Sequence, residues 1–169
     1  AHRGHAGNAQ GQVEVSHHAS DDLQLLVVLL PEVGLIGLHD FRIMGGAEAS
    51  RAFRAYQWLR AADELHLRLW MNIPLEHLEQ AITLGLHTGF GDDYLQVGHL
   101  KLFSDGSQGA RTAWMLEPYL DTQLSGMPLT PMADIAEAVH RADRAGLAVA
   151  VHAIGDRAIR ELISVFEEV

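Results

Sequence analysis

The sequence contains no cysteine, and this absence narrows the chemistry that the chain can carry. A disulfide framework and a thiolate metal site are both excluded, so any bound metal must be held by nitrogen and oxygen ligands. Basic residues are also scarce, with 12 Lys and Arg against 22 Asp and Glu and a formal net charge of −10. Nucleic-acid binding needs clustered basic side chains, so we expect no nucleic-acid partner.

Long hydrophobic runs are missing as well. The most apolar stretch, LQLLVVLLPEVGLIGL from Leu23, is interrupted by Pro31 and Glu32 and falls short of the roughly 20 residues that cross a bilayer. The N-terminal residues lack the basic-then-apolar order of a secretory signal. We therefore expect no membrane association and a cytoplasmic location. Because the sequence begins without methionine and ends inside a helical pattern, ISVFEEV, we expect it to be a fragment of a longer protein.

Histidine and apolar residues are abundant, with 11 histidines and 48% apolar residues in 169 positions. The length corresponds to about one domain. Residues 1–20 have no sustained periodicity and are rich in Gly, Ala, His and Gln, which is typical of a loop or disordered tail. We expect this tail to precede a single domain over residues 21–169.

Helical and strand-like patterns alternate after this tail. Periodicity, capping residues and proline positions predict helices over 21–33, 47–63, 74–84, 130–146 and 156–169. Apolar or alternating runs predict strands over 35–41, 65–73, 94–103 and 147–155. The interval 104–127 is expected to be a long irregular loop.

The last two helices carry the most explicit signals. Thr130 is the expected N-cap of the first of them, with Pro131 as its first residue, and Asp156 is the expected cap of the second. Their periodicity predicts one buried stripe at Ile135, Ala138, Val139 and Ala142, and another at Ile159, Leu162, Ile163 and Phe166.

Apolar strands that alternate with amphipathic helices indicate an α/β fold with a parallel sheet covered by helices. An open doubly wound sheet and a (β/α)8 barrel both fit this order. The doubly wound fold usually has a glycine-rich phosphate turn after its first strand, and HDFRIMGG matches that pattern poorly. Four strands are too few to close a barrel, so the barrel interpretation requires a partial barrel.

Polar side chains stand at the carboxyl ends of the predicted strands, where both architectures place their active groups. The set comprises His39 and Asp40, Asn72, Lys101 with Asp105 beyond it, and His152 with Asp156 beyond it. Lys101 raises a particular question, because a charge in an apolar layer costs several kcal/mol unless it is paired, neutralised or bound.

Five of these residues have a structural alternative that the sequence leaves open. His152 could be a core histidine bonded to backbone carbonyls, and Lys101 could belong to a structural ion pair. His39 and Asp40 could serve loop entry and helix capping, and Asp156 an N-cap.

Three stretches together resemble the metal-dependent amidohydrolase superfamily. They are VGLIGLHDF (33–41), VGHLKLFSDGSQGARTAWMLEPY (97–119) and GLAVAVHAIGDRAIRELISVFEEV (146–169). The sequence is most similar to the amidohydrolase 3 branch, which includes N-substituted formamide deformylase-like enzymes, and the likeness runs from about Leu23 to Val169. The resemblance implies a partial (β/α)8 TIM barrel that holds about strands two to five.

The resemblance also implies a site. Lys101 would be the carboxylated lysine at the end of strand four, and His152 a metal-ligating histidine at the end of strand five. The cofactor would be one or two divalent ions, zinc being expected, and Asp105 and Arg111 would line a substrate pocket. The implied activity is hydrolysis of a carbon–nitrogen bond, in a small-molecule amide or N-acyl compound, by metal-activated water.

The sequence departs from the family pattern at other ligand positions. It has no His-x-His pair, since HRGH has the wrong spacing, and it stops before strands six to eight. We therefore assign no catalytic residue and expect the fragment alone to be inactive. Its open sheet edges would favour self-association, and a homo-oligomer is one outcome.

Two rival functions remain at this point. The chain could be a non-catalytic α/β module that binds small molecules or partner chains. It could also be a flavodoxin-like phosphate binder that uses SDGSQGA, which predicts a helix beginning within residues 106–111.

Overall fold

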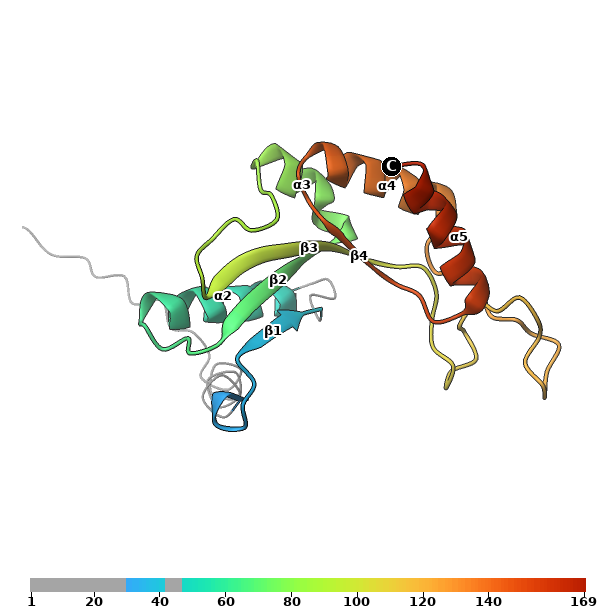
Figure 1. The fold of residues 1–169 in the computed structure, drawn as a ribbon, viewed down its shortest axis with the longest axis horizontal. Helices are drawn as coiled ribbons and strands as arrows, with labels where there is room; N and C mark the ends of the chain where they lie inside the picture. Colours follow the sequence, from blue (N-terminus) through green and yellow to red (C-terminus); the bar gives the residue numbers. More distant parts are fainter. Residues whose placement is uncertain (1–29, 42–46) are drawn as a thin grey trace, which may run out of the picture.

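The computed structural model describes residues 30–41 and 47–169, so the predicted tail and most of the first predicted helix lie outside the described residues. The elements, in chain order, are β1 (Gly37–Asp40), α2 (Ala47–Ala61), β2 (Arg68–Pro74), the 3-10 helix η1 (Leu75–His77), α3 (Leu78–Thr83), β3 (Leu95–Phe103), α4 (Met132–Arg144), β4 (Val149–His152) and α5 (Asp156–Glu167) (Figure 1). None of the helices in this described part has the length and apolar character needed to cross a bilayer.

The four strands form one parallel sheet in the order β1-β2-β3-β4. Each strand is therefore added beside the preceding one. A doubly wound sheet instead reverses its strand order at a switch point, and this reversal is absent from the sheet of the described residues. The fold is an α/β half-barrel, as the partial-barrel interpretation predicted (Figure 1).

The helices cover one face of this sheet, which is the outer face of the half-barrel. Leu69 and Met71 of β2 pack in a cluster with Tyr56 of α2, while Ile73 of β2 packs against a second cluster formed by α3, α4, α5 and β3. Alternate residues of a strand share a face, so both clusters lie on the same side of the sheet. Leu100, in the second cluster, is fully buried, and burial of such a side chain stabilises the fold by about 2 kcal/mol.

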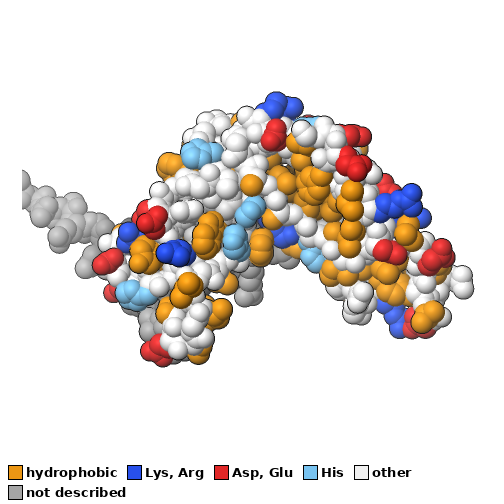
Figure 2. Space-filling view, in the orientation of Figure 1, with side chains coloured by type: hydrophobic (Ala, Val, Ile, Leu, Met, Phe, Trp, Pro, Cys, Tyr) orange, Lys and Arg blue, Asp and Glu red, His pale blue; other side chains and the backbone are white. Residues whose placement is uncertain are grey.

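The opposite face is called here the inner face. Register partners in a parallel sheet point to the same side, and the pairs are His39↔Trp70, Lys101↔Ala150 and Phe103↔His152. The inner face thus carries His39, Trp70, His99, Lys101, Phe103 and His152. In the space-filling view the molecule is arched, and histidine side chains gather near the middle of the arch (Figure 2).

The predicted stripe of α4 is confirmed, since Ile135, Ala138, Val139 and Ala142 are all buried. The predicted capping of this helix is wrong by one position. Pro131, with φ −55° and ψ 139°, occupies the N-cap, and Met132 is the first helical residue. The extended backbone of Pro131 cannot belong to the first turn, and its carbonyl accepts the N–H groups of Asp134 and Ile135.

The predictions for α5 also need correction. Gly155, not Asp156, is the N-cap, and the buried residues are Ala158, Leu162 and Val165, whereas Ile159, Ile163 and Phe166 are exposed. A side chain at the cap would place its Cβ 1.9 Å from the carbonyl oxygen of Trp114, so only glycine fits there. Of the predicted stripe, Leu162 alone is buried.

Candidate active site

Lys101 lies on the inner face and is half-buried. Its Nζ donates hydrogen bonds to the carbonyl oxygens of Leu102 at 2.9 Å and Ala150 at 3.4 Å. The same nitrogen lies 4.2 Å from the ring centroid of Phe103 and 5.7 Å from that of Phe41. Among the described residues no carboxylate pairs with it, so the ion-pair alternative is not seen there, and carbonyl oxygens and aromatic faces surround the ammonium group instead.

Lys101 is also the only lysine in the 169-residue sequence. Burial lowers the pKa of its ammonium group below the ordinary lysine value, because desolvation penalises the charged form. A neutral amine is the form in which lysine acts as a nucleophile. All the other Lys or Arg positions in the sequence are arginine. This single lysine is a signal that could have strengthened the prediction of Lys101 as a site residue.

His152 lies at the end of β4 on the same face, and its imidazole is held in one tautomer. Its Nε2 lies 2.8 Å from the carbonyl oxygen of Gly106. A carbonyl can only accept, so Nε2 carries the proton and Nδ1 keeps its lone pair. Metal-ligating histidines commonly donate their other ring N–H to a backbone carbonyl in this way.

The ring of Phe103 lies against both predicted metal ligands, Lys101 and His152. Its ring contacts Lys101 Nζ at 4.2 Å, and its centroid lies 5.3 Å from that of the His152 ring. The structure therefore places Lys101 and His152 on the same face and at the carboxyl ends of neighbouring strands, with one aromatic ring touching both.

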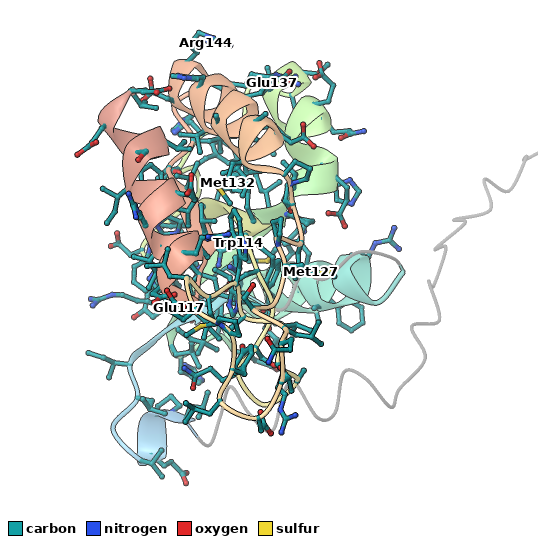
Figure 3. All side chains as sticks on the ribbon, turned by 90° about the vertical axis from the view of Figure 1, so that its right-hand side faces the viewer. Trp114, Glu117, Met127, Met132, Glu137 and Arg144 are labelled. Atoms are coloured by element: carbon teal, nitrogen blue, oxygen red, sulfur yellow. The ribbon has the colours of Figure 1, made fainter. Side chains whose placement is uncertain are left out.

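Asp105 follows β3 and is fully buried. Its carboxylate accepts N–H groups from Trp114 at 2.8 Å, Ile154 at 3.0 Å and Gly155 at 2.7 Å. These bonds tie the loop after β3 to the start of α5, and Trp114 lies below α4 and beside α5 (Figure 3). Asp105 thus fixes the start of the loop whose Gly106 carbonyl contacts His152.

Arg111 is in the same loop but is exposed to solvent. Its guanidinium forms an ion pair with Asp121, which is also exposed. Residues 104–131 of this loop contain no helix, so the helix that the phosphate-binder interpretation requires is absent from this segment. The structure does not bring Arg111 into contact with Lys101 or His152, and its role in a substrate pocket stays a prediction, as does that of Asp105.

The structure adds His99 to the inner face, a residue that the sequence analysis did not single out, and places it against Asn72. Asn72 of β2 is fully buried and contacts His99 of β3. The ring of His99 lies 5.4 Å from that of His39, which stacks on Trp70 at 4.9 Å. Burial, and secondarily the neighbouring His39, lower the pKa of His99. A period-two count along the strand could have placed His99 on the face of Lys101.

The residues present fit a metal site in part. In the described part of the chain, no group of three or more His, Cys, Asp or Glu side chains is arranged to hold a metal ion. Catalytic zinc takes three protein ligands, and the imidazole of His152 supplies a suitable nitrogen. Lys101 becomes a ligand only as a neutral amine or as a carbamate. Lys101 and His152 by themselves are thus fewer than the three protein ligands that a catalytic zinc takes.

Comparison with known proteins places the chain in a family. Residues 9–169 match the amidohydrolase 3 family, described as the Amidohydrolase family. YtcJ of Bacillus subtilis, by name an amidohydrolase, is 29% identical over 136 residues, which are 80% of this chain and 25% of that protein. The LONG AFTER FAR-RED 3 protein of Arabidopsis thaliana is 29% identical over 116 residues, or 68% of this chain and 20% of that protein.

Two crystal structures are similar, both of uncharacterised metal-dependent hydrolases. The Pyrococcus horikoshii enzyme has a TM-score of 0.73 at 28% identity, and the match covers 88% of this chain and 30% of that one. The Pyrococcus furiosus enzyme has a TM-score of 0.75 at 32% identity, covering 88% and 31%. The chain thus spans less than a third of these relatives. The family match over residues 9–169 includes the half-barrel and its inner face. This chain belongs to the amidohydrolase family.

Proposed function

We propose that the protein carrying this chain hydrolyses a carbon–nitrogen bond in a small-molecule amide or N-acyl compound. The observation that carries the proposal is the placement of Lys101 and His152 on one face, at the ends of adjacent strands, with the Phe103 ring against both. A bound divalent ion, for which we propose zinc, would lower the pKa of a water toward about 7 and polarise the scissile carbonyl. The names of the two structural relatives support a metal-dependent hydrolase.

His152 would contribute Nδ1 to the metal site. Donation from Nε2 to the Gly106 carbonyl fixes the ring orientation and leaves Nδ1 as the basic nitrogen. Asp105 Oδ1 lies 3.9 Å from Nε2, on the protonated side of the ring. The loop after β3 therefore orients this histidine through the Gly106 carbonyl.

Lys101 would contribute a carbamate. Its lowered pKa increases the fraction of neutral amine, which can attack CO₂ to form a C–N bond while one proton leaves the nitrogen. The product is an anion with two oxygen donors in place of an ammonium group. Carbamylation would therefore remove the cost of a half-buried cation and supply ligands for one or two metal ions.

The test uses protein expressed from its complete reading frame. Metal content is measured with and without bicarbonate, and ¹³C NMR with ¹³C-bicarbonate detects a carbamate. Because Lys101 is the only lysine in these 169 residues, Lys101→Arg should remove a carbamate signal that comes from this region. Lys101→Arg and His152→Ala should each lower metal content and hydrolysis at least 100-fold, while the exposed His66→Ala should leave both unchanged. Metal-free, unmodified protein would instead support a non-catalytic binding module.

A further inference from the structure

A β-bulge between β2 and β3 positions a second polar side chain, that of His99, on the inner face near Lys101. Met71 pairs with Val97, but Ile73 pairs with Leu100, so two residues of β3, Gly98 and His99, stand opposite Asn72 alone. Bulges leave the extra residue without its ladder partner and redirect side chains, and they are frequent beside active sites. Val97 and Leu100 thereby both face the core, although they are three residues apart.

Asn72 fills the gap that the bulge leaves. Its Nδ2 donates to the carbonyl oxygen of Asp40 at 2.8 Å, and its Oδ1 accepts the backbone N–H of His99 at 2.8 Å. A backbone carbonyl can only accept and a backbone N–H can only donate, so the carboxamide has one orientation. Gly98 makes room for it, since a Cβ at that position would lie 2.8 Å from Oδ1.

The fixed carboxamide also fixes the tautomer of the His99 ring. Asn72 Oδ1 lies 3.2 Å from His99 Nδ1, and because this oxygen has no proton, Nδ1 must be the donor. The lone pair of the imidazole then belongs to Nε2. Asn72 is completely buried and the His99 side chain only partly, so Nε2 is the ring nitrogen left to act toward the inner face.

An aromatic stack centred on His39 lies beside the ring of His99. His39 stacks on Trp70 at 4.9 Å and on Phe41 at 5.8 Å, with interplanar angles of 9° and 14°. Its centroid lies 5.4 Å from that of His99. Phe41 is 46% exposed and lies 5.7 Å from Lys101 Nζ, so the stack extends from His99 toward the lysine.

We propose that His99, His39, Trp70 and Phe41 form a substrate subsite beside Lys101, in which Nε2 of His99 accepts a hydrogen bond from an N–H group of the substrate. The aromatic stack receives a flat apolar substituent on the same molecule. Asn72 is a positioning residue that acts through His99. The proposal rests on the proposed function and narrows its substrate class to secondary amides or N-acyl amines with such a substituent.

The tautomer is tested first, on protein from the complete reading frame labelled with ¹⁵N-histidine. Two-bond ¹H–¹⁵N spectra at pH 8, where an ordinary imidazole is neutral, should show Nδ1–H and a bare Nε2 for the signal that His99→Phe removes. Asn72→Ala should let this ring populate both tautomers, which loss of packing alone would not do. An Nε2–H ring in the unsubstituted protein would overturn the proposal whatever the variants show.

Binding is tested with two probes, acetanilide, which has an N–H group, and N-methylacetanilide, which lacks it. Acetanilide should shift the Nε2 signal of His99 and bind about tenfold tighter than the methylated probe, the value of one hydrogen bond. His99→Phe should abolish this preference, while His66→Phe, at an exposed position before β2, should keep it. Equal binding of the two probes, or no shift at His99, would overturn the subsite.

Failure of the subsite and failure of the proposed function give different results. If the protein holds no metal and hydrolyses no amide but keeps the preference for acetanilide, the subsite stands and the hydrolase proposal falls. If metal content and hydrolysis depend on Lys101 and His152 but the probes do not discriminate, the hydrolase proposal stands and the subsite falls.

Discussion

Lys101 and Phe103 are neighbours on the inner face, with the lysine nitrogen 4.2 Å from the centroid of the phenyl ring. Phe103 is also the register partner of His152. The ring makes a cation–π contact with the ammonium group, and its centroid lies 5.3 Å from that of the His152 ring. Phe103 is thus next to both of the side chains on which the proposed function depends, Lys101 and His152.

The first prediction concerns the acidity of Lys101. Burial lowers its pKa in the folded protein, so acetylation by acetic anhydride should show an inflection below the ordinary value of about 10.4. Between the two pKa values the unfolded state binds more protons, so this group makes stability rise with pH across that window. Peptide mapping by mass spectrometry measures the reaction at this residue. The inflection should return to its ordinary value in urea, and an identical inflection in both states would contradict the prediction.

The second prediction concerns the buried carboxylate of Asp105. Asp105→Asn replaces one acceptor oxygen by an N–H₂ group that must face a backbone N–H, so urea unfolding should show a loss of about 3 kcal/mol. Asp121→Asn is the matched control, because this exposed carboxylate pairs only with exposed Arg111 in the described structure and should change stability by less than about 0.5 kcal/mol. Equal effects of the two substitutions would show that Asp105 does not anchor the loop.

The third prediction tests the bulge. In Gly98→Ala the new methyl group would lie 2.8 Å from Asn72 Oδ1 and 3.2 Å from the Met71 carbonyl oxygen, and the carboxamide must move. We expect a loss of about 1–3 kcal/mol in the free energy of unfolding. Gly109→Ala, with no atom within 4 Å of the added Cβ, should be neutral or slightly stabilising. A tolerated alanine at position 98 would mean that Asn72 is not confined there.

The fourth prediction is a pH dependence from Tyr56. Burial, and then the charge and hydrogen bond of Asp40 at 2.9 Å, raise the pKa of this phenol above its ordinary value of about 10. Above that pH the unfolded state loses a proton that the folded state keeps, so stability should fall as pH rises. Urea unfolding between pH 9 and 11 should show this slope, and Tyr56→Phe should reduce it. Tyr94→Phe, at an exposed position, should leave it unchanged.

The element order and the position of the site could be predicted from local signals. Apolar runs such as 147–155 and amphipathic stripes such as Ile135 with Val139 record which residues are buried, because burial follows the period of each element. Parallel strands bring their carboxyl ends to one edge, so Lys101 and His152 could be expected together before any coordinates. The family resemblance added the expected chemistry of both side chains.

The tertiary structure decided what depends on contacts distant in the sequence. Period two alone would place Val97 on the face of Lys101, but the bulge opposite Asn72, 27 residues before His99, places it in the core. In the same way, Gly155 became the cap of α5 because the carbonyl of Trp114 lies where a side chain would stand. Sequence periodicity predicts which residues of one helix or strand are buried. Bulges, helix caps and histidine tautomers depend instead on contacts with a second element. Only the folded chain brings the two elements together.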